Sequence, residues 1–308
     1  MNFDLTEDQR EIQRTAREWL ASRYPIARVR EIALDGGSDA TWDEIDELGW
    51  PEIADFGMVE LAVVAEQLGF SLAPTPLASH WAARLLHPEL EGRGTVAMWD
   101  GEDGAKLAVP AADVADTIIV QRGDQVFAVP AAEASIEPAN ALDPTRPLFT
   151  VRASGGEEIT GDHLARAWHA IYVAAAAESV GVAARVTAMS VEYAKERKQF
   201  GRPIGSYQAV SHACAQMFLE TEGARNVVLW AAWALDNDPD AAFMAANAAK
   251  AYASDAAVNV CRSSMQVHGG IGFTWEHDLH LFFKRAEANA RAFGDSTWHR
   301  EQVAATYL

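Results

Sequence analysis

Basic residues are concentrated in one short segment of an otherwise acidic chain. Residues 195–202 read Lys-Glu-Arg-Lys-Gln-Phe-Gly-Arg, whereas the whole chain has 25 Lys and Arg against 44 Asp and Glu, a formal net charge of −19. The guanidinium of Arg197 can donate parallel hydrogen bonds to phosphate oxygens, and Phe200 can pack on a ring. Cations are also favoured at the end of a helix. The segment therefore predicts either a phosphate clamp or a helix terminus.

A second segment, 266–273, reads Gln-Val-His-Gly-Gly-Ile-Gly-Phe. Its glycines allow a backbone to approach a ligand closely or to adopt a positive φ angle. They are equally typical of a helix end followed by a sharp turn. The segment is not a dinucleotide fingerprint, because no strand is predicted before it. His268 alone is more typical of a hydrogen-bonded structural residue than of a ligand or a base.

A third segment, 292–297, reads Ala-Phe-Gly-Asp-Ser-Thr. Asp295 could act as a carboxylate base, but an aspartate at this place is more often the N-cap of the following helix. No Ser-His-Asp triad, HExxH sequence or P-loop is visible. The cysteines, Cys214 and Cys261, form no CxxC pair, so no thiolate zinc site is expected. They are interpreted as buried free thiols in a reducing compartment.

Composition limits the function classes. The 308 residues are 49% hydrophobic and 22% charged, which is typical of an ordered globular protein. The acidic surface disfavours nucleic acid and anionic membranes. The N-terminal residues contain no basic region followed by an apolar run, so no signal peptide is predicted. The longest apolar stretch, 171–186, contains Glu178 and Arg185 and suits helix packing better than lipid. We expect a cytoplasmic protein without membrane insertion.

The order of predicted elements is helices, a small sheet and then a helical bundle. Capping-box residues Thr6 and Gln9 begin the first helix, and Gly69 is predicted to end a helix over 58–68. Strand patterns follow, with a hairpin around Arg122-Gly-Asp124. Helices are then predicted over 163–198, 206–235, 238–267 and 276–291, with a further one from 296. This pattern favours a mainly α fold with three parts: an N-terminal helical domain over 1–93, a shortened β-domain over 94–160, and a C-terminal four-helix bundle over 161–308.

In this order the segments resemble the acyl-CoA dehydrogenase family. The likeness is carried by the opening from Phe3, by 48–76 with Ala-Pro-Thr-Pro, by 196–208 (Glu-Arg-Lys-Gln-Phe-Gly-Arg-Pro-Ile-Gly-Ser-Tyr-Gln), and by 266–276 (Gln-Val-His-Gly-Gly-Ile-Gly-Phe-Thr-Trp-Glu). The last two segments are specific as a pair, because they lie about seventy residues apart in the C-terminal bundle, as the family requires.

The resemblance implies an FAD bound between subunits. One subunit's β-domain would hold the flavin ring, and the neighbour's bundle would clamp the diphosphate and adenosine. By resemblance, the clamping residues in this sequence are Arg197, Gln199, Phe200, Gln266, Gly269 and Gly270. The implied reaction is α,β-desaturation of an acyl-CoA thioester, with a carboxylate as base and hydride transfer to the flavin. An electron-transfer flavoprotein would accept the electrons.

The sequence departs from the family where the catalytic glutamate is expected. At one family position it has Phe293, with Asp295 two residues later, and at the alternative position it has Ile171, two turns before Glu178. The β-domain is shortened, and the flavin-facing Thr-Glu-Pro…Gly-Ser-Asp segment has no counterpart. Gly37-Ser-Asp39 matches by letter only, since it lies in the N-terminal helical region.

These departures remove the half of the site that binds the flavin ring and substrate, and they spare the half that clamps a neighbour's FAD. The chain is therefore similar to the degenerate small subunits of α2β2 acyl-CoA dehydrogenases of sterol side-chain degradation in actinobacteria. It would share FAD with a full-length, catalytic partner subunit. Two alternatives stay open. One is a self-sufficient homo-oligomeric dehydrogenase that uses Asp295, and the other is a non-catalytic structural protein on the same scaffold.

Overall fold

The structure, a computed structural model, describes residues 4–35 and 42–307 and divides into two units. Unit 1 comprises Met1–Arg28, Met58–Ala73 and Tyr172–Leu308, and unit 2 comprises Val29–Gly57 and Pro74–Ile171. Helices α2 (Ile26–Asp35) and α6 (His163–Glu196) each continue from one unit into the other. The Gly37-Ser-Asp39 segment lies outside the described residues.

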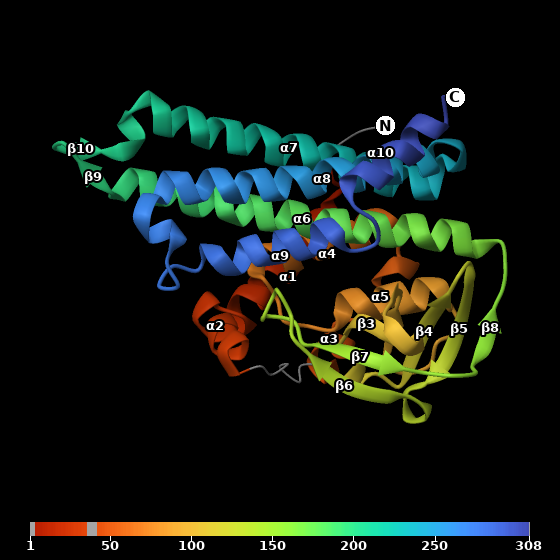
Figure 1. The fold of residues 1–308 in the computed structure, drawn as a ribbon. Helices are drawn as coiled ribbons and strands as arrows, with labels where there is room; N and C mark the ends of the chain where they lie inside the picture. Colours follow the sequence, from red (N-terminus) through yellow and green to blue (C-terminus); the bar gives the residue numbers. More distant parts are fainter. Residues whose placement is uncertain (1–3, 36–41, 308) are drawn as a thin grey trace. The chain divides into compact units, whose positions relative to one another are not determined.

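Unit 1 is built from long helices rich in alanine. Besides α6 from residue 172 onward, they are α1 (Glu7–Arg23), α4 (Met58–Ser71), α7 (Gln208–Asn237), α8 (Pro239–His268), α9 (Leu279–Arg291) and α10 (Ser296–Ala305). Helix α7 packs along α8, and α9 and α10 also pack against α8 (Figure 1). Small alanine side chains let these helices approach closely, so the predicted helical bundle is confirmed.

The local signals that begin two of these helices act as predicted. The Thr6 hydroxyl accepts a hydrogen bond from the Gln9 N–H, and the Gln9 side chain accepts one from the Thr6 N–H, which completes the capping box of α1. At α8, the Asp238 side chain accepts a hydrogen bond from the Ala241 N–H, and Pro239 occupies the first turn. The fourth predicted helix of the C-terminal region, α9, begins at Leu279, three residues later than predicted.

The predicted helix end at Gly69 is wrong. Helix α4 continues to Ser71, and Gly69 is buried inside it. A Cβ atom added at Gly69 would lie 2.0 Å from the carbonyl oxygen of Glu178, and one added at Gly181 would lie 1.9 Å from that of Glu66. Both glycines are therefore needed because the backbones of α4 and α6 nearly touch.

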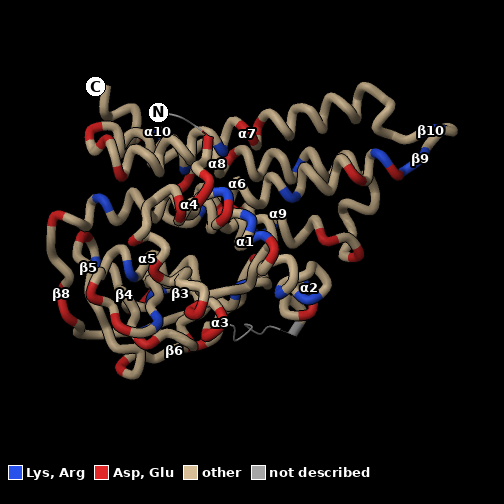
Figure 2. Tube along the Cα trace, turned by 180° about the vertical axis from the view of Figure 1, so that it is seen from behind, with Lys and Arg blue, Asp and Glu red and all other residues tan. Residues whose placement is uncertain are grey.

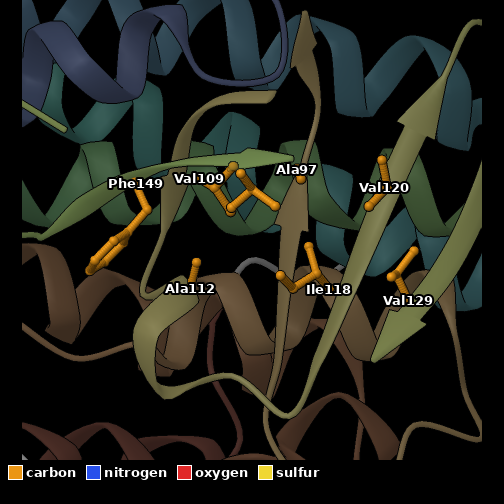
Figure 3. Close-up of a cluster of buried hydrophobic side chains, with 8 residues drawn as sticks. Ala97, Val109, Ala112, Ile118, Val120, Val129 and Phe149 are labelled. Atoms are coloured by element: carbon orange, nitrogen blue, oxygen red, sulfur yellow. The ribbon is translucent and has the colours of Figure 1, made fainter. Parts of the chain in front are cut away.

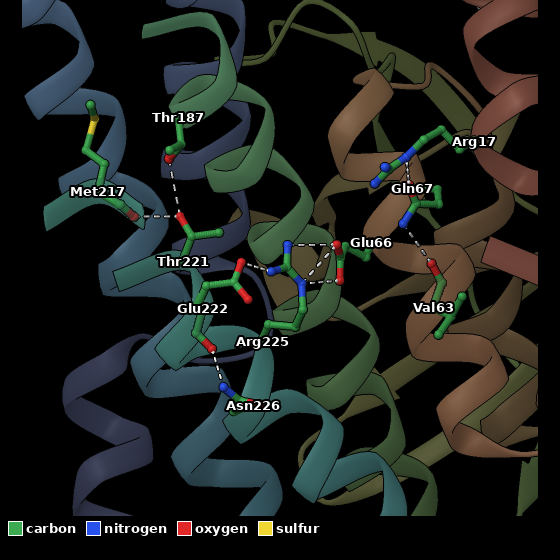
Figure 4. Close-up of polar contacts among 10 residues, drawn as sticks. All are labelled: Arg17, Val63, Glu66, Gln67, Thr187, Met217, Thr221, Glu222, Arg225 and Asn226. Carbon is green, nitrogen blue, oxygen red and sulfur yellow. Dashed lines mark hydrogen bonds and ion pairs between the residues drawn. The ribbon is translucent and has the colours of Figure 1, made fainter. Parts of the chain in front are cut away.

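Charged residues also join the helices of unit 1. The Arg225 guanidinium on α7 donates to both carboxylate oxygens of Glu66 on α4, at 3.0–3.2 Å, and also to Glu222 (Figure 4). On the other side of α4, the Arg17 side chain donates to the Gln67 side chain at 2.9 Å. These contacts tie α1 and α7 to α4.

Unit 2 contains two four-stranded sheets and short helices. One sheet has the order β1-β4-β5-β8 and the other β2-β3-β7-β6, and the described pairs are antiparallel except β1 with β4. The strands are β1 (Gly94–Ala97), β2 (Trp99–Asp100), β3 (Lys106–Pro110), β4 (Thr117–Arg122), β5 (Gln125–Pro130), β6 (Ser135–Ala139), β7 (Leu148–Arg152) and β8 (Glu157–Ile159). The helices are α3 (Trp42–Glu47) and α5 (Leu77–Leu86).

The core of unit 2 lies between the two sheets. Its buried side chains come from both sheets and, at Ala112, from the short 3₁₀ helix Ala112–Val114 (Figure 3): Ala97, Val109, Ala112, Ile118, Val120, Val129, Phe149 and Val151. The hairpin predicted around Arg122-Gly-Asp124 is confirmed, since β4 and β5 pair from Thr117 with Pro130 to Arg122 with Gln125. A small β-domain therefore exists, as predicted.

One helix among the described residues is long and apolar enough to cross a membrane by length and composition. This helix is α6, and 72% of its most apolar window is buried inside the structure. Its apolar side chains therefore pack against the neighbouring helices of the fold.

Candidate functional site

The basic segment forms the end of α6 and a small hairpin beyond it. The Arg197 N–H donates to the Tyr193 carbonyl at 2.9 Å, which closes the last turn of the helix. Strand β9 (Lys198–Gln199) then pairs with β10 (Arg202–Pro203), with Gln199 opposite Arg202. The helix-terminus interpretation of this segment is thus correct as local structure, and it leaves the side chains available for a ligand.

The hairpin turn has an unfavourable backbone conformation. Phe200 has φ 52° and Gly201 has φ 83°, and the left-handed region costs an ordinary residue roughly 1–2 kcal/mol. The Phe200 side chain is 94% exposed, so its burial in this chain does not offset the strain. A strained and exposed aromatic residue points to a contact outside the chain.

The four cations of the basic segment 195–202 differ in their partners. Lys195 pairs with Glu192 at 2.9 Å, and the Arg202 guanidinium lies 4.1 Å from the ring centre of Tyr207. The exposed side chains of Arg197 and Lys198 form no hydrogen bond or ion pair with the residues that the structure describes. Figure 2 shows basic residues at the β9–β10 end of a chain whose other charges are largely acidic. These two cations are therefore available to an anion.

The glycine segment follows directly on α8. The Gly269 N–H caps the helix by donating to the Met265 and Gln266 carbonyls, with φ 64° at Gly269, and residues Gly269–Phe273 form the 3₁₀ turn η6. Gln266 and Gly270 are exposed. A Cβ atom at Gly269 or Gly270 would meet no atom within 4 Å. The structure thus leaves open space above this turn.

The two predicted binding segments lie at the same end of the bundle. The ring of Tyr193, one turn before Arg197, stacks on the ring of His268, with centroids 4.4 Å apart and planes at 24°. One turn deeper, the Ser190 hydroxyl donates to the Ser264 hydroxyl at 2.7 Å. Helices α6 and α8 therefore end side by side, and the structure brings the arginine segment and the glycine segment together.

Asp295 lies in the loop between α9 and α10. Its side chain accepts a hydrogen bond from the Trp298 N–H at 2.8 Å, so the predicted N-cap of α10 is confirmed. Phe293, two residues earlier, has φ 60° and a half-buried side chain. At the position where the family resemblance expects a glutamate, the chain therefore has a phenylalanine in a left-handed conformation.

Two buried side chains hold the backbone of this loop. The Lys250 ammonium donates to the carbonyls of Gly294 at 3.2 Å and Asn289 at 3.0 Å, and also to Ser254. The buried His299 imidazole has its Nε2 atom 3.1 Å from the Phe293 carbonyl oxygen. Burial lowers the pKa of Lys250 from 10.5 to about 7, although Asp295 and Asp255 oppose the shift. Burial, with nearby Lys250, lowers the pKa of His299 to about 4.

Glu178 belongs to a buried network of the same region. Its carboxylate accepts hydrogen bonds from the Arg285 guanidinium at 2.8 Å and from the Asn289 amide at 3.1 Å. The exposed fractions of the Arg285 and Glu178 side chains are 0% and 5%. Glu178 therefore serves as the counter-charge of Arg285. Ile171, at the alternative position expected for the catalytic glutamate, is buried and apolar.

Sequence reasoning missed Lys250, His299 and the Tyr193–His268 stack. A lone lysine in the alanine-rich stretch 241–257 is a signal that could have indicated the first, because a charge on an apolar helix face needs partners. The stack joins residues 75 positions apart, and no local pattern indicates it.

The fold agrees with the comparisons with known proteins. A helical bundle with a small two-sheet domain is the class that the structure defines, and the family profile "Acyl-CoA dehydrogenase, C-terminal domain" matches residues 172–308. Acyl-CoA dehydrogenase IpdE2 of Mycolicibacterium smegmatis is 35% identical over 254 residues, which cover 80% of this chain and 77% of that protein. The chain therefore belongs to the acyl-CoA dehydrogenase family, a family of FAD-dependent oxidoreductases, and the predicted fold class is confirmed.

Two solved structures share nearly the whole fold. A chain of a variant of the Tcur3481–Tcur3483 steroid acyl-CoA dehydrogenase is 25% identical, with a TM-score of 0.86 and 98% of both chains covered. A chain of the ChsE4–ChsE5 complex from Mycobacterium tuberculosis is 22% identical with the same TM-score, covering 100% of this chain and 99% of that one, and it shows the fold alone.

The residues at the bundle end fit part of an FAD. A diphosphate needs cations and open backbone, and Arg197 and Lys198 are unpaired among the described residues, beside a turn with room above Gly269 and Gly270. An adenosine needs an aromatic or apolar surface, and Phe200 is 94% exposed. These residues would hold the nucleotide part of the cofactor, which supplies hydride acceptance at its flavin ring when bound.

Proposed function

We propose that this chain is the non-catalytic, FAD-clamping subunit of a heteromeric acyl-CoA dehydrogenase. A full-length partner subunit would bind the flavin ring and supply the catalytic base in an α2β2 assembly. The reaction is α,β-desaturation of an acyl-CoA thioester, with an electron-transfer flavoprotein as acceptor. Similarity to one chain of a two-component steroid dehydrogenase supports a steroid side-chain CoA thioester as the substrate class.

The observation that carries the proposal is Arg197, unpaired among the residues that the structure describes, beside the open glycine turn. The chain has 44 acidic residues, yet the Arg197 side chain forms no ion pair with the described residues. Arg197 stays exposed next to Phe200, whose backbone is left-handed and whose side chain is 94% exposed. Both features are explained if a partner's nucleotide covers them.

The region of the expected catalytic acid has a different character. Asp295 caps α10, Phe293 stands where the glutamate is expected, and Glu178 is committed to Arg285. Among the carboxylates considered from the sequence, none is both exposed and free of a structural role. This supports a partner as the source of the base.

The first test is the flavin content of the purified chain, alone and with a full-length family member encoded beside it. The proposal expects a colourless lone chain and a yellow heterotetramer with half of the flavin that a family homotetramer would carry. A lone chain that is yellow and forms a tetramer would instead support the self-sufficient dehydrogenase.

The clamp is tested in that complex by Arg197→Ala. Loss of charge-assisted hydrogen bonds to a diphosphate should weaken FAD binding by roughly 10- to 100-fold, measured as flavin absorbance per assembly after dilution. Lys195→Ala is the matched control, because it removes a cation two residues away that pairs with Glu192. Equal flavin content in the wild type and Arg197→Ala would contradict the assignment.

A further inference from the structure

We infer that Tyr193 and His268 form a spacer that sets the distance between the two halves of the clamp. The inference rests on the proposed function. Neither residue belongs to the set expected to touch the cofactor. Tyr193 lies one turn before Arg197 at the end of α6, and His268 directly precedes Gly269 at the end of α8.

Tyr193 is linked to the arginine half of the clamp. Its carbonyl accepts the hydrogen bond from the Arg197 N–H at 2.9 Å, so the two residues share the last turn of α6. The Tyr193 ring is half-buried, and its hydroxyl makes no hydrogen bond with the described residues. The ring therefore contributes through packing, and a shift of the ring would move the turn that carries Arg197.

His268 is linked to the glycine half. It is the last residue of α8, only 4% exposed, and its Nδ1 lies 2.9 Å from the Ser264 carbonyl oxygen, which fixes the ring along the helix. A Cβ atom at Gly272 would lie 3.0 Å from the His268 Cβ atom, so the η6 turn folds directly onto this residue. The His277 ring also contacts the His268 ring, with centroids 4.6 Å apart and planes tilted by 60°.

The stack of Tyr193 on His268 joins the arginine half and the glycine half of the clamp. The rings of Tyr193 and His268 lie 4.4 Å apart at 24°, and one turn below them the Ser190–Ser264 hydrogen bond fixes the two helices. Aromatic contacts of this kind have a defined separation. Arg197 follows Tyr193 by one helical turn, and Gly269 and Gly270 directly follow His268. The stack therefore sets the distance between Arg197 and the glycine turn. Tyr193 and His268 are positioning residues in this inference.

The test measures FAD release from the heteromeric complex by the rise of flavin fluorescence on dilution. Tyr193→Ala should speed release by roughly 2- to 10-fold, the range expected for loss of an aromatic pair. Tyr193→Leu keeps apolar volume without stacking and should behave in the same way, which guards against a folding defect in Tyr193→Ala. Tyr193→Phe keeps the ring and is the matched control, with unchanged release.

A double-mutant cycle distinguishes positioning from general stability. If Tyr193 acts by placing Arg197, then Tyr193→Ala should add little to release in the Arg197→Ala background. Full additivity, or wild-type release in both Tyr193→Ala and Tyr193→Leu, would overturn the spacer. Wild-type release in Arg197→Ala would overturn the proposed function itself, so the two failures are distinguishable.

Discussion

Two turns of unit 1 each contain a phenylalanine in the left-handed region, and their surroundings are opposite. Phe200, with φ 52°, is 94% exposed beside Arg197, which is unpaired among the described residues. Phe293, with φ 60°, is half-buried in a loop whose Phe293 and Gly294 carbonyls are held by His299 and Lys250. Among the described residues, the first turn has exposed contacts with Tyr207, whereas buried side chains contact the carbonyls of the second.

The difference is consistent with the binding role proposed for the first turn and with a structural role for the second. Strain in a backbone persists only when the surroundings impose it. Around Phe293, the buried side chains of Lys250 and His299 contact the loop carbonyls and supply that constraint from within the chain. Around Phe200, the chain supplies an edge contact with the Tyr207 ring, with centroids 6.4 Å apart, but leaves the Phe200 side chain 94% exposed. The comparison therefore supports the proposed ligand contact at the hairpin, and it indicates a structural role for the α9–α10 loop.

The largest expected effect concerns the buried Glu178–Arg285 ion pair, which supports the α9–α10 loop through Asn289. Glu178→Ala removes the counter-charge of buried Arg285 and a partner of Asn289, whose carbonyl binds Lys250. Leaving a buried charge unpaired should lower the free energy of unfolding by roughly 3–5 kcal/mol, measured by chemical denaturation. Glu192→Ala, on the exposed side of the same helix, should change it by less than about 0.5 kcal/mol. Similar values for the two variants would show that the α9–α10 region is not held from within.

The second prediction uses pH to test whether Lys250 is a buried constraint. The pKa of Lys250 is lowered to about 7 in the fold, below its value in the unfolded chain. Between these values the unfolded chain binds more protons, so raising the pH should increase stability, by up to about 1.4 kcal/mol per pH unit. Lys250→Met should lose this gain between pH 7 and 8.5, as followed by urea denaturation at each pH. An unchanged slope in the variant would contradict a lowered pKa.

The third prediction compares the two phenylalanines directly. Glycine relieves left-handed strain but increases the entropy of the unfolded chain. Phe200→Gly should therefore change the free energy of unfolding of the lone chain by less than about 1 kcal/mol, while it weakens FAD retention in the complex. Phe293→Gly loses a half-buried ring and should lower that free energy by roughly 1–3 kcal/mol, with FAD retention unchanged. If Phe200→Gly proves to be the more destabilising of the two, the hairpin is part of the chain's own core.

The same contrast explains what could be predicted from the sequence. Local signals carry their own physics, so the capping box at Thr6, the Asp238 cap and the β4–β5 hairpin could be predicted from neighbouring residues. The prediction of a helix end at Gly69 is wrong because a glycine is needed there for close packing against the α6 backbone, more than a hundred residues away. The arginine and glycine segments could be named, but the Tyr193–His268 stack beside them joins residues 75 positions apart, and no periodicity indicates it.

The smallest expected effect tests the remaining carboxylate of the α9–α10 loop. The Asp295 side chain accepts the Trp298 N–H, and asparagine can accept the same hydrogen bond. Asp295→Asn should therefore leave both stability and turnover of the heteromeric complex near the wild type. Asp295→Ala should cost about 1 kcal/mol of stability through loss of the cap, with turnover per folded complex unchanged. Turnover that collapses in Asp295→Asn while the assembly and its flavin remain intact would assign the base to this chain. The α9–α10 loop would then carry the catalytic base, and the purely structural role given to it in this comparison would be wrong.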